Sequence, residues 1–275
     1  MRRIVARGPL AEKAGQPEEG ARMDEAEPER AHAAPHPPLR KYYHAPADRP
    51  GYVQTLFDRT AGHYDRINAL MSLGAGRRYR REMLVEAGLR PGMRALDIAI
   101  GTGLVAREAR HLLAGSGRVV GLDVSAGMLA EARRLGAADD LVQACAEALP
   151  FREAAFDLVS VGYALRHVAD LEKTFRELGR VLRPGGSLLL LELTEPEAPL
   201  GRAVLRLYLA RIVPLVSLLA TGNGDALTLM RYNWATIAAC VPPADILDAM
   251  SGAGLAGVRS EVQYGVLRAY IAKRP

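Results

Sequence analysis

An apolar segment that leads into a glycine-rich turn constrains the fold of this chain more than any other feature. Residues 94–103 read RALDIAIGTG, an apolar run that carries Asp97 and then turns through Gly101 and Gly103. From Leu104 on, apolar residues recur at helical spacing with arginines between them. The pattern therefore predicts a strand, a turn and a helix, and the glycines let a ligand approach the turn because they lack a Cβ.

A second apolar segment, residues 119–122, follows the predicted helix and ends in Asp123. In nucleoside-binding units of this type, a carboxylate about 20 residues beyond the turn accepts hydrogen bonds from the ribose hydroxyls. We therefore expect a cofactor that contains a nucleoside, with Asp123 as its ribose ligand.

Two cofactors compete for this turn. Its glycines and Ala106 also fit the dinucleotide fingerprint, in which a pyrophosphate lies at the N-terminus of the helix. Asp97 favours S-adenosylmethionine instead, because a carboxylate would repel a pyrophosphate but attract an ammonium and a sulfonium group. An NAD-dependent dehydrogenase and a turn without a ligand are the weaker interpretations. The expected cofactor-binding residues here are Asp97, Gly101, Thr102, Gly103 and Asp123.

The composition allows a folded domain and argues against several classes of partner. With 49% hydrophobic residues the 275-residue chain can bury a sizeable core, and its net charge of +5 is mild. The basic residues are not interleaved with aromatic ones, so we expect no nucleic-acid partner. Cys145 and Cys240 form neither a metal-binding spacing nor a disulfide framework, which fits a reducing cytoplasm, and we expect no metal site.

The chain begins with a predicted tail. Residues 1–48 are rich in proline, alanine, glutamate and arginine and have no apolar periodicity, which predicts disorder. Residues 1–14 lack the apolar core of a secretory signal. Helical spacing then begins, and residues 49–89 are predicted to form two or three short helices.

The centre of the chain alternates strands and helices over residues 90–195. This alternation predicts an α/β fold, a parallel sheet with helices on both faces and ligands at the carboxyl ends of its strands. Residues 251–275 should add two closing strands. The expected core strands lie near residues 93–98, 117–122, 140–144, 156–161 and 186–192.

Residues 196–250 are mostly apolar and are predicted to form a helical cap that lines a pocket for an apolar aromatic substrate. The stretch 203–220 contains Arg206, Arg211 and Pro214, so we expect no transmembrane helix. Together with Arg202, these arginines suggest a peripheral membrane contact. A homodimer is a further hypothesis.

The chain resembles the ubiquinone/menaquinone-biosynthesis C-methyltransferases, and the resemblance runs from about Val53 to Lys273. It rests on Leu56-Phe57-Asp58, Tyr64-Asp65-x-x-Asn68-x-Leu70-Met71-Ser72, Leu96-Asp97 with Gly101-Thr102-Gly103, Ala146-Glu147-Ala148-Leu149-Pro150-Phe151, Leu165-Arg166, Arg180-Val181-Leu182-Arg183-Pro184-Gly185-Gly186 and Leu191-Glu192. The resemblance implies a class I methyltransferase fold, which is Rossmann-like, and ring C-methylation of a prenylated benzoquinol or naphthoquinol. It also implies that Thr102, Asp123, Cys145 and Ala146 contact S-adenosylmethionine.

The candidate substrate residues are Tyr64, Asn68, Tyr163 and Tyr232. Tyr64 and Asn68 share one face of a helix, because they are four residues apart. The chain departs from the family pattern beside these positions. The family has Asp where this chain has Ala69 and Asn where it has His167. It often has Asp or Asn where this chain has Cys145.

Ring methylation needs an electron-rich carbon, which a phenolate provides. A phenol has a pKa near 10, so forming its anion at pH 7 costs roughly 4 kcal/mol. We interpret His167 as the base and Arg166 as the cation that holds the phenolate oxygen, with Asp65 as a substitute base. The alternative is structural: Arg166 pairs with a carboxylate and His167 caps a helix.

Two alternatives to quinol methylation remain at this point. One is a methyltransferase for another small aromatic or polyketide-like molecule, which the departures at the substrate positions favour. The other is a scaffold that keeps the methyltransferase fold without catalysis, which the retention of the whole cofactor turn disfavours.

Overall fold

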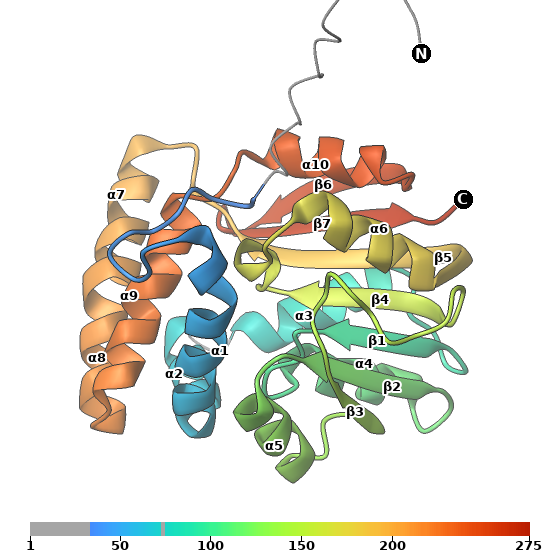
Figure 1. Cartoon of the computed structure of the whole chain (residues 1–275), viewed down its shortest axis with the longest axis horizontal. Helices are drawn as coiled ribbons and strands as arrows, with labels where there is room; N and C mark the ends of the chain where they lie inside the picture. Colours follow the sequence, from blue (N-terminus) through green and yellow to red (C-terminus); the bar gives the residue numbers. More distant parts are fainter. Residues whose placement is uncertain (1–33, 73–74) are drawn as a thin grey trace, which may run out of the picture. The chain divides into compact units, whose positions relative to one another are not determined.

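A seven-stranded sheet forms the centre of the computed structural model, which describes residues 34–72 and 75–275 (Figure 1). Its strand order is β3-β2-β1-β4-β5-β7-β6, with the first five strands parallel and β7 antiparallel to both of its neighbours. The strands are β1 Arg94–Ile98, β2 Arg118–Asp123, β3 Asp140–Gln143, β4 Phe156–Gly162, β5 Leu182–Leu193, β6 Ala256–Gln263 and β7 Leu267–Lys273. The sheet confirms the predicted α/β fold.

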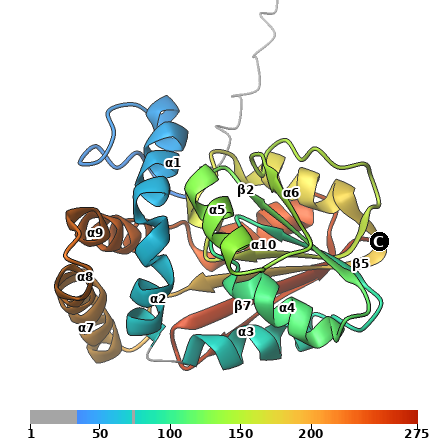
Figure 2. The ribbon, with the colours of Figure 1, turned by 90° about the horizontal axis from the view of Figure 1, so that it is seen from below.

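The central strands are apolar on both faces because helices cover both. In β5 the four consecutive residues 188–191 are leucines with no exposed surface, as expected for a strand between two helical layers. On one face lie α3 Ala75–Glu86, α4 Leu104–Leu113 and α5 Ala126–Arg134. On the other lie α6 Leu171–Val181 and α10 Pro243–Gly252 (Figure 2). We expected α10 within the cap, but its Ile246 and Met250 are buried in the core beside α6.

A separate group of helices stands at the carboxyl ends of the parallel strands (Figure 1). It has its own core, which includes Leu56, Ile67, Val213, Leu229 and Tyr232. Its elements are α1 Arg49–Thr60, α2 Tyr64–Ser72, α7 Pro199–Leu207, the π-helical turn η4 Tyr208–Ile212, α8 Val213–Thr221 and α9 Gly224–Ala238. Ligands of parallel sheets bind at this end, so these helices enclose the expected site.

Residues 34–48 are not a tail, which corrects the prediction made from composition. His36 and Tyr43 are buried, with 1% and 4% of their surface exposed. The backbone N–H of Val241 donates to the carbonyl of Pro35 at 2.8 Å, and Arg49 Nη2 donates to the carbonyl of His36 at 2.9 Å. The remainder of the predicted tail, residues 1–33, lies outside the described residues.

Gly103→Ala should lower the free energy of unfolding by about 2–5 kcal/mol, because two costs add. Gly103 has a φ of +89°, and an added Cβ would lie 2.1 Å from the Cβ of Ala137. Gly88→Ala is the matched control, since its φ is +91° and no atom lies within 4 Å of the added Cβ. Urea denaturation should show a loss of about 1 kcal/mol for the control, from strain alone. Equal losses in the two variants would show that the contact with Ala137 is unimportant.

Candidate active site

A cavity of about 480 Å³ opens at the carboxyl ends of β1, β2 and β4, beneath α1. Its wall is formed by the glycine-rich turn, the end of β2 and aromatic side chains from several elements. The lining residues are Pro50, Val53, Gln54, Phe57, Tyr64, Ile98, Ala99, Gly101, Leu122, Asp123, Val124, Met128, Ala144, Cys145, Ala146, Glu147, Val161, Gly162, Tyr163, Ala164, His167, Val168, Ala169, Asp170, Lys173 and Thr174.

Asp97 holds the turn together and does not line this cavity. Its Oδ2 accepts the backbone N–H of Ala106 at 3.1 Å, and its Oδ1 accepts the hydroxyl of Ser160 at 2.7 Å. Ser160 lies opposite Asp97 in the register of β1 and β4, so both side chains are on the same face of the sheet. The carboxyl is 2% exposed, and burial raises its pKa to about 7. In this arrangement both oxygens of Asp97 are engaged within the protein, and its contact with a cofactor stays a prediction.

The glycines of the turn have different tasks. Gly101 lines the cavity with a φ of +55°, so its backbone is open to a ligand. Gly103 forms the N-cap of α4 and packs against Ala137, away from the cavity. Thr102 is buried and its hydroxyl donates to Asp65. Neither Gly103 nor Thr102 therefore lines the cavity.

Asp123 lines the cavity and is fixed by the turn. Its Oδ2 accepts the backbone N–H of Gly101 at 2.8 Å and its Oδ1 accepts that of Ser125 at 2.9 Å. Each carboxylate oxygen has a further lone pair, so the group can still accept two hydroxyl donors from a ligand. Burial raises the pKa of Asp123. The predicted neighbours Cys145 and Ala146 also line the cavity.

Asp65 is committed to other partners. Its Oδ2 accepts Arg107 Nη2 at 2.7 Å, in addition to the hydroxyl of Thr102. These contacts fasten α2 to the start of α4. Since Asp65 is outside the cavity lining, the structure does not support its assignment as a substitute base.

Arg166 is a buried ion-pair partner and does not reach the cavity. Its Nη1 lies 2.7 Å from Glu192 Oε2, and its Nε donates to the hydroxyl of Thr236 at 3.2 Å. Glu192 Oε1 also accepts the backbone N–H of Leu165 at 2.9 Å, so this pair fixes the short turn η3 Leu165–His167. The alternative in which Arg166 pairs with a carboxylate is therefore confirmed.

His167 is in the cavity wall, as predicted, and is surrounded by aromatic rings. It stacks on Tyr232 at 5.6 Å between ring centroids and meets the edge of Phe57 at 5.4 Å. Neither ring nitrogen has a hydrogen-bond partner among the described residues. Burial, with added repulsion from Arg166, His36 and Arg49, lowers its pKa well below 6.5. The imidazole is thus neutral at pH 7, and both of its nitrogens are buried without a partner.

The four predicted substrate residues are divided between the wall and the layer behind it. Tyr64 and Tyr163 line the cavity, and burial raises the pKa of Tyr163 to about 12. Asn68 is outside the lining and donates to the carbonyl of Tyr64 at 3.2 Å. Tyr232 is fully buried behind His167, so it supports the imidazole and does not face the cavity.

Helix α1 contributes residues that the prediction of the site missed. Val53 and Phe57 cover the cavity. Asp58 Oδ1 anchors the helix, because it accepts the hydroxyl of Ser125 at 2.5 Å and the N–H of Gly127 at 2.9 Å. The motif Leu56-Phe57-Asp58 was visible in the sequence, but an amphipathic helix gives no sign of which element it will cover. The part of the chain that the structure describes contains no cluster of three potential metal ligands.

Comparison with known proteins gives a consistent assignment. The model of the ubiE/COQ5 methyltransferase family matches residues 46–272. The chain is 38% identical over 185 residues to the ubiquinone/menaquinone biosynthesis C-methyltransferase UbiE of Hahella chejuensis, covering 65% of this chain and 74% of that protein. The UbiE protein of Shewanella frigidimarina is 36% identical over 211 residues, which cover 74% and 81% of the two chains.

Solved structures agree on the fold. A S-adenosylmethionine-dependent methyltransferase of Thermotoga maritima, described as a possible histamine N-methyltransferase, superposes with a TM-score of 0.57 and 18% identity. The match covers 81% of this chain and 99% of that one. At this identity the likeness establishes the architecture alone.

Asp97→Asn should flatten the pH dependence of stability between about pH 4 and about pH 7. As pH rises, the unfolded chain loses the proton of this group near 3.8, whereas the folded chain keeps it to about 7. The free energy of unfolding that Asp97 contributes therefore falls across this interval, by at most about 4 kcal/mol. Denaturant titrations of both proteins across the interval measure the difference. Identical slopes would mean that Asp97 is ionised in the folded protein.

Proposed function

Because the chain belongs to the ubiE/COQ5 methyltransferase family, and is thus a methyltransferase, we propose that it methylates a ring carbon of a prenylated benzoquinol or naphthoquinol. We propose S-adenosylmethionine as the methyl donor. One observation carries the proposal: a single cavity joins the ribose-type carboxylate Asp123 to an unpartnered, buried imidazole, His167. A cofactor held at the first would face a ring held at the second.

The donor set of the cavity fits S-adenosylmethionine better than a dinucleotide. Three carboxylates, Asp123, Glu147 and Asp170, line it against one cation, Lys173. An excess of carboxylates favours a ligand with ammonium and sulfonium charges and opposes a pyrophosphate. Asp123 would bind the ribose of the cofactor. The backbone at Gly101 would lie close to the cofactor, and Cys145 and Ala146 would flank its adenine. When bound, the cofactor supplies an activated methyl group.

His167 would accept the proton of the ring hydroxyl. A neutral imidazole with both nitrogens unpartnered can accept a hydrogen bond from a phenol and take its proton as the ring carbon attacks the methyl group. The stack on Tyr232 and the edge contact with Phe57 fix the ring plane. Arg166 and Glu192 act as positioning residues, because their ion pair holds the turn that carries His167.

A second candidate substrate is another small aromatic molecule. His167 favours it, because the resembling family has asparagine at this position and an imidazole presents a different acceptor to a ring hydroxyl.

Methyl transfer to two acceptors distinguishes these proposals. We expect turnover of a demethylated prenylated quinol by the purified enzyme, and quinone profiling by mass spectrometry should show the unmethylated precursor in cells that lack this protein. Turnover of simple phenols with no change in the quinone profile would instead support the second candidate. Cofactor binding without turnover of any phenol would indicate a scaffold.

Asp123→Ala should weaken the binding of S-adenosylmethionine by about 1–3 kcal/mol, since it removes a charged acceptor for two hydroxyls. Asp140→Ala is the control, because Asp140 is a partly exposed carboxylate paired with Arg118 at 2.8 Å, outside the cavity lining. Isothermal calorimetry with S-adenosylmethionine and with NAD measures both effects. Tighter binding of NAD would overturn the cofactor assignment, and an unchanged affinity would place the ribose elsewhere.

His167→Ala should lower kcat by roughly 10² to 10⁴, the usual contribution of general acid–base catalysis, with little change in cofactor affinity. The lowered pKa of His167 means that it gains a proton only well below pH 6.5, so the acidic limb of the wild-type pH–rate profile should lie there. The variant should lose that limb. His167→Asn is the matched variant: if it retains both the rate and the acidic limb, another group is the base.

A further inference from the structure

The outer edge of the molecule is a single helical segment with an unusual surface. α7, η4 and α8 form one run of 23 residues, Pro199–Thr221, which is long and apolar enough to cross a membrane by length and composition. Only 22% of its most apolar part is buried. The run contains no carboxylate, and its charged residues are Arg202, Arg206 and Arg211.

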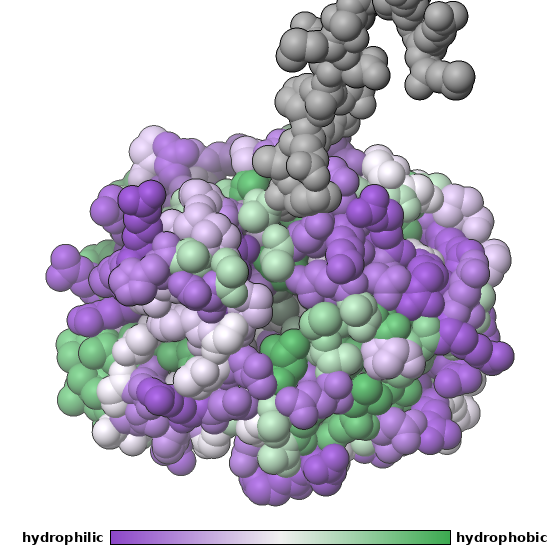
Figure 3. All heavy atoms as spheres, viewed as in Figure 1, coloured by the Kyte–Doolittle hydropathy of each residue, from purple (hydrophilic) through white to green (hydrophobic). Residues whose placement is uncertain are grey.

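The exposed apolar side chains of the described residues concentrate on this run. Seven of the ten large ones belong to it, and apolar residues are visible at the edge formed by α8 in Figure 3. The seven are Leu200, Val204, Leu207, Ile212, Leu215, Val216 and Leu219. Scattered exposed apolar residues need no explanation, but a continuous patch marks a contact with a partner or a membrane.

The π-helical turn keeps these residues on one face. Apart from the adjacent pair Leu215 and Val216, successive residues are three or four positions apart, except for the step of five between Leu207 and Ile212. The turn Tyr208–Ile212 covers this step, and a π-turn accommodates one extra residue per turn. Without it, the two halves of the stripe would diverge around the helix by about 100°.

The opposite side of the run is packed against the protein. Leu209, Val213 and Ser217 are buried, and α8 packs along α9. A helix with one side fixed to the domain and the other side apolar would lie in the plane of a bilayer surface and not across it.

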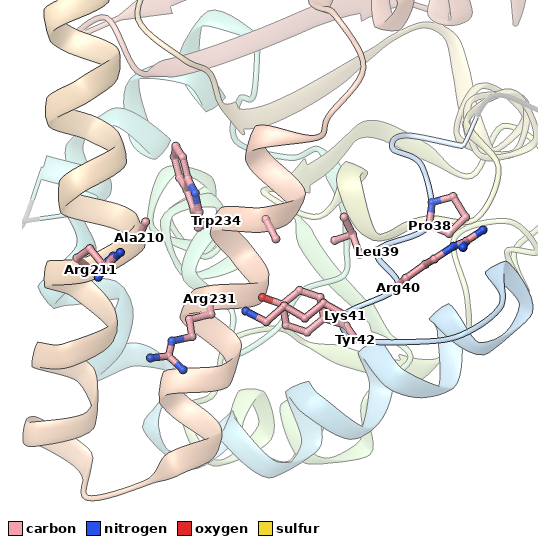
Figure 4. Close-up of a pocket in the computed structure, with 10 residues that line it drawn as sticks. Pro38, Leu39, Arg40, Lys41, Tyr42, Ala210, Arg211, Arg231 and Trp234 are labelled. Carbon is pink, nitrogen blue, oxygen red and sulfur yellow. The ribbon is translucent and has the colours of Figure 1, made fainter.

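A groove of about 580 Å³ borders the apolar face and carries a concentrated positive charge (Figure 4). Arg40, Lys41, Arg211 and Arg231 line it with Tyr42 and Trp234, and no carboxylate does. None of the four cations forms an ion pair with another described residue. Arg211 precedes the exposed Ile212, so the groove and the apolar face meet at η4.

We propose that the apolar face of Pro199–Thr221 docks onto an anionic phospholipid bilayer and that the basic groove receives the lipid phosphates. Charge complementarity selects this occupant: arginines and a lysine border the face, as polybasic groups border membrane-bound helices. Trp234 and Tyr42 suit the interface between headgroups and acyl chains. A second copy of the chain fits less well, because a two-fold pairing would bring together two arginine-bearing helices that lack carboxylates.

Co-sedimentation with vesicles tests the apolar face. The full chain should bind vesicles of phosphatidylcholine and phosphatidylglycerol, and added salt or vesicles of phosphatidylcholine alone should weaken the binding. Leu207→Glu with Leu219→Glu should reduce binding at least about tenfold, since two apolar side chains leave the membrane and two like charges enter. The matched control, Val85→Glu with Val262→Glu, changes two exposed residues away from this face and should bind like the wild type.

A second pair of variants tests the groove and the rival partner. Arg211→Gln with Arg231→Gln should weaken binding to the anionic vesicles about tenfold or more. Binding to neutral vesicles should change little. Thermal melts confirm folding, since all altered residues are exposed. The proposal is overturned if the wild type does not bind anionic vesicles or if the control pair loses as much as the Leu207 and Leu219 pair. It is also overturned if the only effect of Leu207→Glu with Leu219→Glu is to convert a dimer into a monomer in analytical centrifugation.

Discussion

The buried carboxyl of Asp97 is the interaction on which the site depends. It joins β1, β4 and the first turn of α4 through one hydroxyl and one backbone N–H, in a place where water cannot substitute for either partner. Its position sets the path of the glycine turn, whose N–H at Gly101 then fixes Asp123. A carboxylate can therefore order the backbone that lines a cavity without lining the cavity itself.

The sequence predicted the architecture because that part of the problem is periodic. Apolar runs, glycine turns and helical spacing identified the sheet and Asp123, the family resemblance added Cys145, and the usual pKa of an imidazole suggested His167. The partners of buried polar groups are not periodic. Arg166 pairs with Glu192 and Asp65 with Arg107, 26 and 42 residues away, so their assignment as catalytic groups could not be checked before the fold was known.

The N-terminal segment shows a different limit of prediction. Composition suggested disorder up to residue 48, since prolines and charged residues dominate that average. Residues 34–48 are nevertheless fixed by contacts with later parts of the chain: Tyr42 packs edge-on to Tyr232, as Tyr52 does, and Arg49 binds the carbonyl of His36. Three aromatic rings outweigh an unfavourable average composition, and they also form the layer behind His167, so the segment supports the site from a distance.

The π-helical turn has a consequence for how this helix can change. The turn accommodates one additional residue, so the two halves of the helix share one outer stripe and one packed side. Deletion of one residue between 208 and 212 would shorten the five-residue step from Leu207 to Ile212 to an ordinary helical step of four, so both faces would keep their directions without a π-turn. A deletion in α7 or α8 would instead rotate the positions beyond it by about 100°, so the number of residues is under stronger constraint in these two helices than in the turn between them.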